Sequence, residues 1–229
     1  MTHRYPPPPS PDELGLVPPG AAAGGRRSGD DLPKMKKFRF QLLARWITER
    51  FPPCTVADVG GGKGLLTHLL GQAGFQAEVV DPVDQPLPPR YRDLASGRRV
   101  RLDEATVTRR RVPFGPALGR RYDLLVALHA HGANLAVLET VARAGNSCVV
   151  LPCCVVGEPA APGPGQSWFM WLVGRARELG LEPEFFALNF RGQHVGFAVR
   201  GERPTTTWSR PAGDGQRTPT RSRPAADGQ

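Results

Sequence analysis

The hydrophobic and polar positions of the chain follow two alternating patterns. Apolar residues at intervals of three and four predict amphipathic helices, and short continuous apolar runs predict buried strands. Helices are predicted over 33–51, 64–74, 132–145 and 166–180, and strands over 54–59, 77–82, 98–105, 122–130 and 147–155. Strands that alternate with helices in this way build a parallel sheet with helices on both faces.

Two further apolar runs, 182–190 and 193–201, follow the last predicted helix. Only Arg191 and Gly192 separate them, and such a short connection predicts an antiparallel hairpin. The expected fold class is therefore α/β. We predict a doubly wound, Rossmann-like sheet that is mostly parallel and carries an antiparallel hairpin strand at its C-terminal end.

The two ends of the chain differ from the middle in composition. Residues 1–30 and 201–229 are rich in Pro, Gly and Ala and show no hydrophobic period. Such segments bury too little apolar surface to offset the entropy lost on ordering. We therefore expect disordered ends around one folded domain at 31–200. The chain has no apolar run that is typical of a signal peptide or a membrane span. We therefore interpret it as soluble and cytoplasmic, with no membrane partner.

The net charge of the chain is +9, which favours an anionic partner, with nucleic acid first. Part of this charge reflects a general bias, because the chain also contains 27 glycines and 25 prolines. The cysteines are Cys54, Cys148, Cys153 and Cys154. None of them has C-x-x-C spacing, so the sequence predicts neither a disulfide framework nor a metal site.

The stretch VADVGGGKG, residues 56–64, lies between a predicted strand and a predicted helix. It is not a phosphate-binding P-loop, because Gly64 replaces the Ser or Thr that should follow Lys63. It is not the dinucleotide pattern either, because Leu65 occupies the place of the third glycine. The stretch instead has an acid followed by alternating glycines, at Asp58, Gly60, Gly62 and Gly64. An acid suits a cationic ligand group, and glycines let the backbone approach a ligand closely. An ordinary tight turn is the alternative.

Acids also end the next two predicted strands, at Asp81 and Asp103. The carboxyl ends of strands in an open α/β sheet line its ligand crevice. Together with the loop of Asp58, this arrangement resembles the class I S-adenosylmethionine (SAM)-dependent methyltransferases. The resemblance implies SAM as the cofactor, with Asp81 at the ribose hydroxyls and Asp103 at the adenine amino group. For Asp103, a solvated turn residue is an equally good interpretation.

The fourth and fifth predicted strands end in ALHAHG and LPCC. This pairing resembles a methyltransferase branch with LHxCG and PCC signatures, which includes tRNA 2′-O-methyltransferases and methyltransferase-like proteins. His129 and Gly132 match the first signature, and Cys153 and Cys154 match the second. His131 stands where the branch has cysteine. The resemblance implies methylation of an RNA, with tRNA or rRNA first.

Candidate catalytic residues lie within these two signatures. His129 and His131 alternate, so both face the same side if the strand continues that far. A histidine there could remove a proton from the methyl acceptor, or could simply orient the loop. Cys153 would suit attack on a pyrimidine ring, although cysteine is often only a small buried apolar residue. No lysine follows Lys63, so the usual lysine-containing set for ribose methylation cannot form.

Positive charge gathers at the start of the first predicted helix, at Lys34, Lys36, Lys37 and Arg39. Cations are unfavourable at a helix N-terminus, so RNA phosphate is a candidate partner and a solvated face is the alternative. Trp168, Phe169 and Trp171 could stack on bases, but core packing is favoured for two of them. The expected function is SAM-dependent methylation of RNA. The alternatives are methylation of a small molecule or protein, and RNA binding without catalysis.

Overall fold

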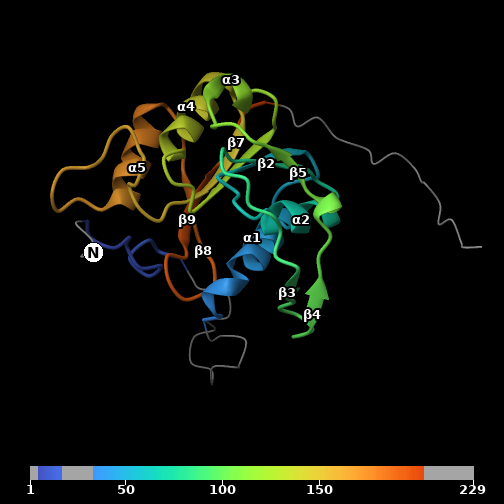
Figure 1. Cartoon of the computed structure of the whole chain (residues 1–229). Coiled ribbons are helices and arrows are strands. Elements are labelled where there is room, and N and C mark those ends of the chain that lie inside the picture. Colours follow the sequence, from blue (N-terminus) through green and yellow to red (C-terminus); the bar gives the residue numbers. More distant parts are fainter. Residues whose placement is uncertain (1–4, 17–32, 204–229) are drawn as a thin grey trace, which may run out of the picture.

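The computed structural model describes residues 5–16 and 33–203, which contain a seven-stranded sheet (Figure 1). The strands are β1 Thr55–Val59, β2 Gln76–Val80, β5 Thr108–Arg110, β6 Leu124–Leu128, β7 Ser147–Leu151, β8 Glu184–Ala187 and β9 Val195–Val199. Their order is β5-β2-β1-β6-β7-β9-β8. From β5 to β7 neighbouring strands are parallel, and β9 is antiparallel to β7 and β8. The predicted doubly wound sheet with a C-terminal antiparallel hairpin is confirmed.

Helices cover both faces of the sheet. They are α1 Arg39–Thr48, α2 Leu65–Gln72, α3 Pro116–Gly119, α4 Asn134–Ala144 and α5 Trp168–Glu178, with 3-10 turns η1 Lys36–Phe38 and η2 Glu104–Thr106. Successive strand residues point to opposite faces. Val56 accordingly packs into the core beneath α1 and α2, and Ala57 packs into the core beneath α4 and α5. These two cores hold β1, β6 and β7 in place. The candidate active site lies at the carboxyl ends of these strands.

The third strand of the sheet is not the predicted one. The segment 98–105 contributes only β4, Arg99–Arg101, which pairs with β3, Arg90–Arg92, in a separate hairpin. The strand beside β2 is instead β5. An edge strand of only Thr and Arg residues has no apolar run, so hydrophobic patterning could not reveal it.

The terminal segments that we expect to be disordered lie mostly outside the described residues. Residues 5–16 are described and form a turn, in which the Leu16 N–H donates to the Pro11 carbonyl at 2.8 Å. Leu14 packs against the core beneath α4 and α5. Within the described ranges, no helix has the length and apolar character that a membrane span requires.

Candidate active site

The glycine loop, Gly60–Gly64, leads from β1 into α2 at the carboxyl edge of the sheet. Gly60, Gly62 and Gly64 have positive φ angles of 62°, 52° and 78°, a conformation that side-chain-bearing residues rarely adopt. The loop is joined to the end of β2. The Gly60 N–H donates to the Val80 carbonyl at 2.9 Å, and the Gly62 N–H donates to Asp81 Oδ2 at 3.0 Å. Asp81 therefore meets the glycine loop, as its place at a strand end predicts.

Asp58 is buried beneath this loop and is only 1% exposed. Its Oδ2 accepts a hydrogen bond from the Thr67 hydroxyl at 2.8 Å. Burial raises the pKa of Asp58 to about 7, although hydrogen bonds from Thr67 oppose the shift. A Cβ atom at position 61 would lie 2.5 Å from Asp58 Cγ, so only glycine fits there. A cationic ligand group would favour the ionised form of this carboxyl group.

Arg109, on β5, holds the outer side of the glycine loop. Its guanidinium donates to the carbonyls of Gly62 at 3.0 Å and Lys63 at 2.9 Å. The same side chain donates to Glu104 Oε1 at 2.6 Å and is 10% exposed. The sequence pattern does not reveal Arg109, because the edge strand that carries it has no apolar signal. Arg109 therefore fixes the loop from a strand that had not been predicted.

A cavity of about 410 Å³ lies between the glycine loop and the start of α1. Small-molecule sites in proteins typically measure about 300–1,000 Å³. The lining includes Asp58, the glycine loop, Arg39, Phe40, Gln85 and His129. Asp81 is not part of the lining, but it accepts a hydrogen bond from Gly62, which is. Four of the residues predicted to bind the cofactor, Asp58, Gly60, Gly62 and Gly64, therefore line one cavity, and Asp81 is hydrogen-bonded to that lining.

The remaining residue predicted to bind the cofactor is Asp103, which the described lining of the cavity does not include. Its Oδ1 accepts a hydrogen bond from the Ala105 N–H at 3.1 Å and caps η2. The prediction that Asp103 ends the third strand of the sheet was wrong, because β5 occupies that place. Asp103 is exposed, as the alternative interpretation of a solvated turn residue expects.

His129 lines the cavity with a strained backbone. β6 ends at Leu128, and the φ angle of His129 is 55°, a left-handed value that is uncommon outside glycine. In the described chain neither buried ring nitrogen of His129 has a hydrogen-bond partner. Burial, followed by the positive charges of Arg39 and Lys36, lowers the pKa of His129 to about 4. The ring is then neutral at pH 7, with one donor and one acceptor for a ligand.

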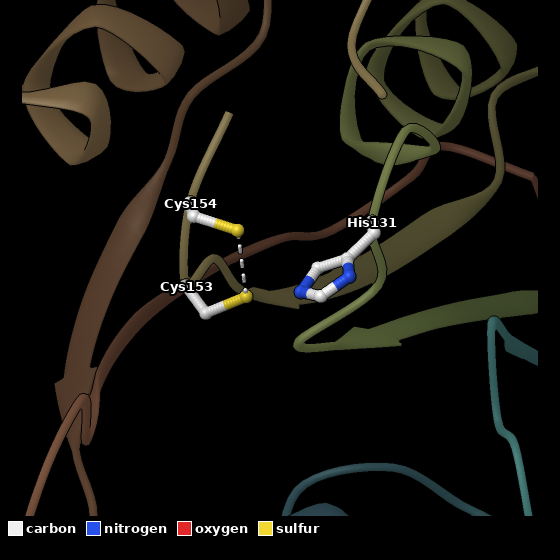
Figure 2. Close-up of side chains that lie close together, drawn as sticks. All are labelled: His131, Cys153 and Cys154. Carbon is white, nitrogen blue, oxygen red and sulfur yellow. Dashed lines mark hydrogen bonds between the residues drawn. The ribbon is translucent and has the colours of Figure 1, made fainter. Parts of the chain in front are cut away.

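His131 and His129 have different surroundings. A shared face was expected only if the strand continued through them, and β6 ends at Leu128. His131 is exposed and lies beside the cysteines that follow β7 (Figure 2). The ligand atoms of His131, Cys153 and Cys154 lie within 4.8 Å of one another. We call these three residues the thiol–imidazole cluster. Burial and the contact with Cys154 raise the pKa of Cys153 to about 12, which disfavours a thiolate nucleophile.

The loops after β6 and β7 are fastened to each other. A Cβ atom at Gly132 would lie 2.7 Å from the Gly157 carbonyl oxygen, so the two backbones touch. Glu158, in the second loop, accepts hydrogen bonds from the N–H groups of Asn134 at 2.8 Å and Leu135 at 3.2 Å. An acid at the N-terminus of α4 also complements the helix dipole. These contacts position the residues of the thiol–imidazole cluster relative to one another.

The basic residues at the start of α1 do not act as one group. Arg39 lines the cavity, with its guanidinium 4.2 Å from the centre of the Phe40 ring. Lys36 and Lys37 are exposed on η1. The Lys34 backbone pairs with the connection between β8 and β9. Of these four predicted substrate contacts, Arg39 is the one that lies at the cavity.

The aromatic residues of α5 belong mainly to the core. Trp168 is 5% exposed and Phe169 is 3% exposed, and both pack beneath α4 and α5. Trp171 is partly buried and stacks on Trp168 with ring centroids 5.3 Å apart. The prediction that two of the three fill the core is confirmed.

No protein-family model and no curated protein sequence matches the chain. Among solved structures, 1,6-didemethyltoxoflavin-N1-methyltransferase from Burkholderia thailandensis, with bound S-adenosylhomocysteine, is 15% identical at a TM-score of 0.48 and covers 72% of this chain and 79% of its own. A TehB-like SAM-dependent methyltransferase from Corynebacterium glutamicum is 18% identical at a TM-score of 0.40, with coverage of 72% and 87%. The ribosomal protein L11 methylase of Lactobacillus delbrueckii subsp. bulgaricus is 17% identical at a TM-score of 0.43, with coverage of 75% and 82%. At these identities the likeness concerns the fold alone.

Proposed function

We propose that the chain is a SAM-dependent methyltransferase whose substrate is an RNA. The observation that carries the first part is a cavity lined by Asp58 and the glycine loop, with Asp81 hydrogen-bonded to that loop. SAM has cationic amino and sulfonium groups and no pyrophosphate. A buried acid and a close backbone approach therefore suit it better than a ring of phosphate-binding amides. When bound, SAM supplies an activated methyl group.

The two acids have different roles in this proposal. Asp58 complements the cationic end of SAM. Because Asp58 is buried, water does not solvate its charge, and a cationic ligand group can compensate it instead. Asp81 accepts one backbone hydrogen bond on each oxygen, from the N–H groups of Gly62 at 3.0 Å and Val83 at 2.8 Å. Each carboxylate oxygen keeps a further lone pair, which can accept a ribose hydroxyl.

His129 and Arg39 line the same cavity as the glycine loop. Both have buried nitrogen atoms that lack a hydrogen-bond partner in the described chain, and buried polar groups of this kind normally find one. We place His129 at the methyl acceptor, where its neutral ring orients the accepting atom. Arg39 suits an anionic group of the cofactor or substrate. Orientation of two reactants can supply a large share of the rate enhancement.

The RNA part of the proposal rests on the arginine hairpin formed by β3 and β4. Its exposed arginines are Arg90, Arg92, Arg98, Arg99 and Arg101. Gln41 ties this hairpin to α1, because its side chain donates to the Arg92 carbonyl at 2.9 Å and accepts from the Leu94 N–H at 2.6 Å. Pro88, two residues before β3, lines the cavity, so the hairpin begins beside the site and carries positive charge away from it. Such a surface favours a phosphate backbone.

The direct test is transfer of tritiated methyl from SAM to total RNA, with protein and small-molecule fractions as competing acceptors. We expect label in RNA and a loss of at least about tenfold in His129→Asn, because misplacement of reacting groups costs up to about 100-fold. Asn is chosen because it tolerates the left-handed backbone. Label only in the other fractions would favour a small-molecule or protein substrate. SAM binding without any transfer would favour a non-catalytic protein.

Salt dependence tests the arginine hairpin. Each neutralised phosphate contributes about −0.7 to the slope of log affinity against log salt for single-stranded RNA. Replacing Arg98, Arg99 and Arg101 by Ser should therefore flatten the slope by about 0.7 for each arginine that pairs with a phosphate in the wild-type chain. Arg177→Ser, on the surface of α5, is the matched control. An unchanged slope in the hairpin variant would contradict RNA binding by this surface.

Among RNA substrates, tRNA is the first to test, because LHAHG and LPCC resemble the signatures of a branch that modifies tRNA. Nuclease digestion of the labelled RNA, followed by chromatography of the nucleosides, identifies the methylated atom. Label in rRNA without label in tRNA would exclude this narrower assignment and leave the RNA proposal intact.

A further inference from the structure

We propose that His131, Cys153 and Cys154 form a zinc site with an open fourth position (Figure 2). The histidine follows β6 and the cysteines follow β7, so the site lies at the carboxyl edge of the sheet. Their ligand atoms lie within 4.8 Å of one another. Figure 2 shows a ring nitrogen of His131 directed toward the sulfur atoms.

The separation of the two sulfurs is close to the one that tetrahedral zinc requires. Zn–S bonds of about 2.3 Å and Zn–N bonds of about 2.0–2.1 Å place two sulfurs roughly 3.8 Å apart and a sulfur and a nitrogen roughly 3.6 Å apart. The two sulfurs of the cluster are 3.5 Å apart. The ring nitrogen of His131 lies within 4.8 Å of both sulfurs, so it must approach them by up to roughly 1.2 Å to share one ion with them.

The donor set selects the type of metal. Thiolate and imidazole are ligands of zinc, whereas magnesium and calcium take oxygen ligands. Cysteine binds a metal as the thiolate, so coordination releases protons from both thiols. Three protein ligands leave a fourth position for water or for a substrate atom, which is the arrangement of catalytic zinc sites.

The fold holds these ligands in place without a metal. The residue after His131 is Gly132, whose backbone touches that of Gly157, three residues beyond Cys154. On the other side, the His129 N–H donates to the Leu151 carbonyl at 3.0 Å. His131 is exposed and the cysteines are half-buried, so an ion can reach the cluster from solvent. The site is therefore both preformed and accessible.

The test is titration of the full chain, reduced and freed of metal, with Co²⁺, followed by displacement with Zn²⁺. Cobalt bound to thiolates in a tetrahedral site absorbs strongly in the visible and gives sulfur-to-metal charge-transfer bands. We expect one ion per chain. Cys153→Ser and Cys154→Ser should each weaken binding more than about 100-fold, because loss of even an outer-shell partner costs about 10–100-fold. His131→Ala should weaken it at least about tenfold.

Matched controls are Cys54→Ala and His194→Ala, which remove a thiol and an imidazole that are not part of the thiol–imidazole cluster. Both should bind cobalt as the wild type does. The proposal would be overturned if Co²⁺ gave no thiolate absorption with the folded, reduced chain. It would also be overturned if that absorption persisted in Cys153→Ser. SAM binding by the same samples is measured in parallel. A chain that binds SAM but no metal refutes the zinc site and leaves the proposed methyltransferase function untouched.

Discussion

Two regions at the same edge of the sheet are built in different ways. The glycine loop follows β1 in one continuous stretch, and its positive φ angles and buried acid are set by residues a few positions apart. The thiol–imidazole cluster joins the loops after β6 and β7, and it depends on the contact between Gly132 and Gly157. The conformation of the first region is therefore largely specified by local sequence, with Asp81 and Arg109 holding it from outside, whereas only tertiary contact brings the second region together. Substitutions should be able to damage either region and spare the other.

The largest effect is expected from Gly61→Ala. The added Cβ would lie 2.5 Å from Asp58 Cγ and 2.9 Å from its carbonyl oxygen, so the loop or the buried acid must move. We expect a loss of about 2–3 kcal/mol in the free energy of unfolding and loss of SAM binding, measured by urea unfolding and calorimetry. The control is Gly71→Ala, inside α2 with open space around it. This substitution should raise the free energy of unfolding by as much as about 1 kcal/mol. Wild-type stability in Gly61→Ala would contradict the close packing of the loop on Asp58.

Gly132→Ala should damage the second region. Its Cβ would lie 2.7 Å from the Gly157 carbonyl oxygen, at a residue whose φ angle is 72°. We expect a loss of about 1–2 kcal/mol and loss of cobalt binding, while SAM binding is retained. Gly174→Ala, inside α5 with open space around it, is the control. If both Gly61→Ala and Gly132→Ala lose SAM binding, the two regions are not independent.

Binding of SAM should depend on pH through Asp58. Burial raises the pKa of this group to about 7, and a bound cationic group would keep it ionised. Binding then releases a proton below pH 7, and affinity should fall about tenfold from pH 8 to pH 6. Calorimetry in buffers with different ionisation enthalpies measures the proton directly. Proton-independent binding would show that SAM does not contact Asp58.

The same pKa shift affects the stability of the SAM-free chain in the opposite direction: SAM binding strengthens as the pH rises, whereas stability falls. Because the folded pKa lies above the ordinary value of 3.8, Asp58 adds stability at low pH. This contribution is lost as the pH rises from about 4 to about 7. Asp58→Asn removes the titration, so the Tm of the variant relative to wild type should increase over that range. A difference in Tm between Asp58→Asn and the wild type that stays constant with pH would contradict the raised pKa of Asp58.

The smallest effect is expected from Glu158→Gln. The amide still accepts a hydrogen bond from the N-terminus of α4, but it no longer complements the helix dipole. We expect a loss of about 0.3–1 kcal/mol, measured by thermal unfolding. Glu139→Gln, which removes an exposed ion pair with Arg143 on the same helix, is the control and should change stability less. Equal effects would show that Glu158 does not act as a cap.

The sequence was informative where structure is local. Asp58, the alternating glycines and Asp81 could be assigned because each lies at a strand end or in the turn that follows it. Arg109 could not be found, since it lies on an edge strand of Thr and Arg residues. Because β5 has no apolar pattern, Asp103 was predicted to end the third strand of the sheet, a place that β5 occupies instead. His129 breaks the expected alternation through a left-handed φ angle, which no residue pattern indicates.

Cysteine spacing is uninformative about a metal site of this kind for a related reason. The absence of a C-x-x-C motif led to the expectation of no metal site, but spacing along the chain says nothing about a ligand from another loop. Cys153 and Cys154 meet His131 only because β6 and β7 are neighbours in the sheet. His131 is also the departure from the LHxCG signature, and histidine and cysteine are both ligands of zinc. The structure does not test the expectation, and the cobalt titration will.

The central claim is that Asp58, the glycine loop and Asp81 hold SAM. Calorimetry of SAM with the wild-type chain, Asp58→Asn and Asp81→Ala tests it most directly, with NAD and ATP as control ligands. Asp84→Ala, an exposed acid close to Asp81 in the chain, is the control variant. We predict binding of SAM alone, weakened about 30-fold or more in both variants, because loss of a buried charged partner costs about 2–5 kcal/mol. A folded wild-type chain that does not bind SAM would contradict the account.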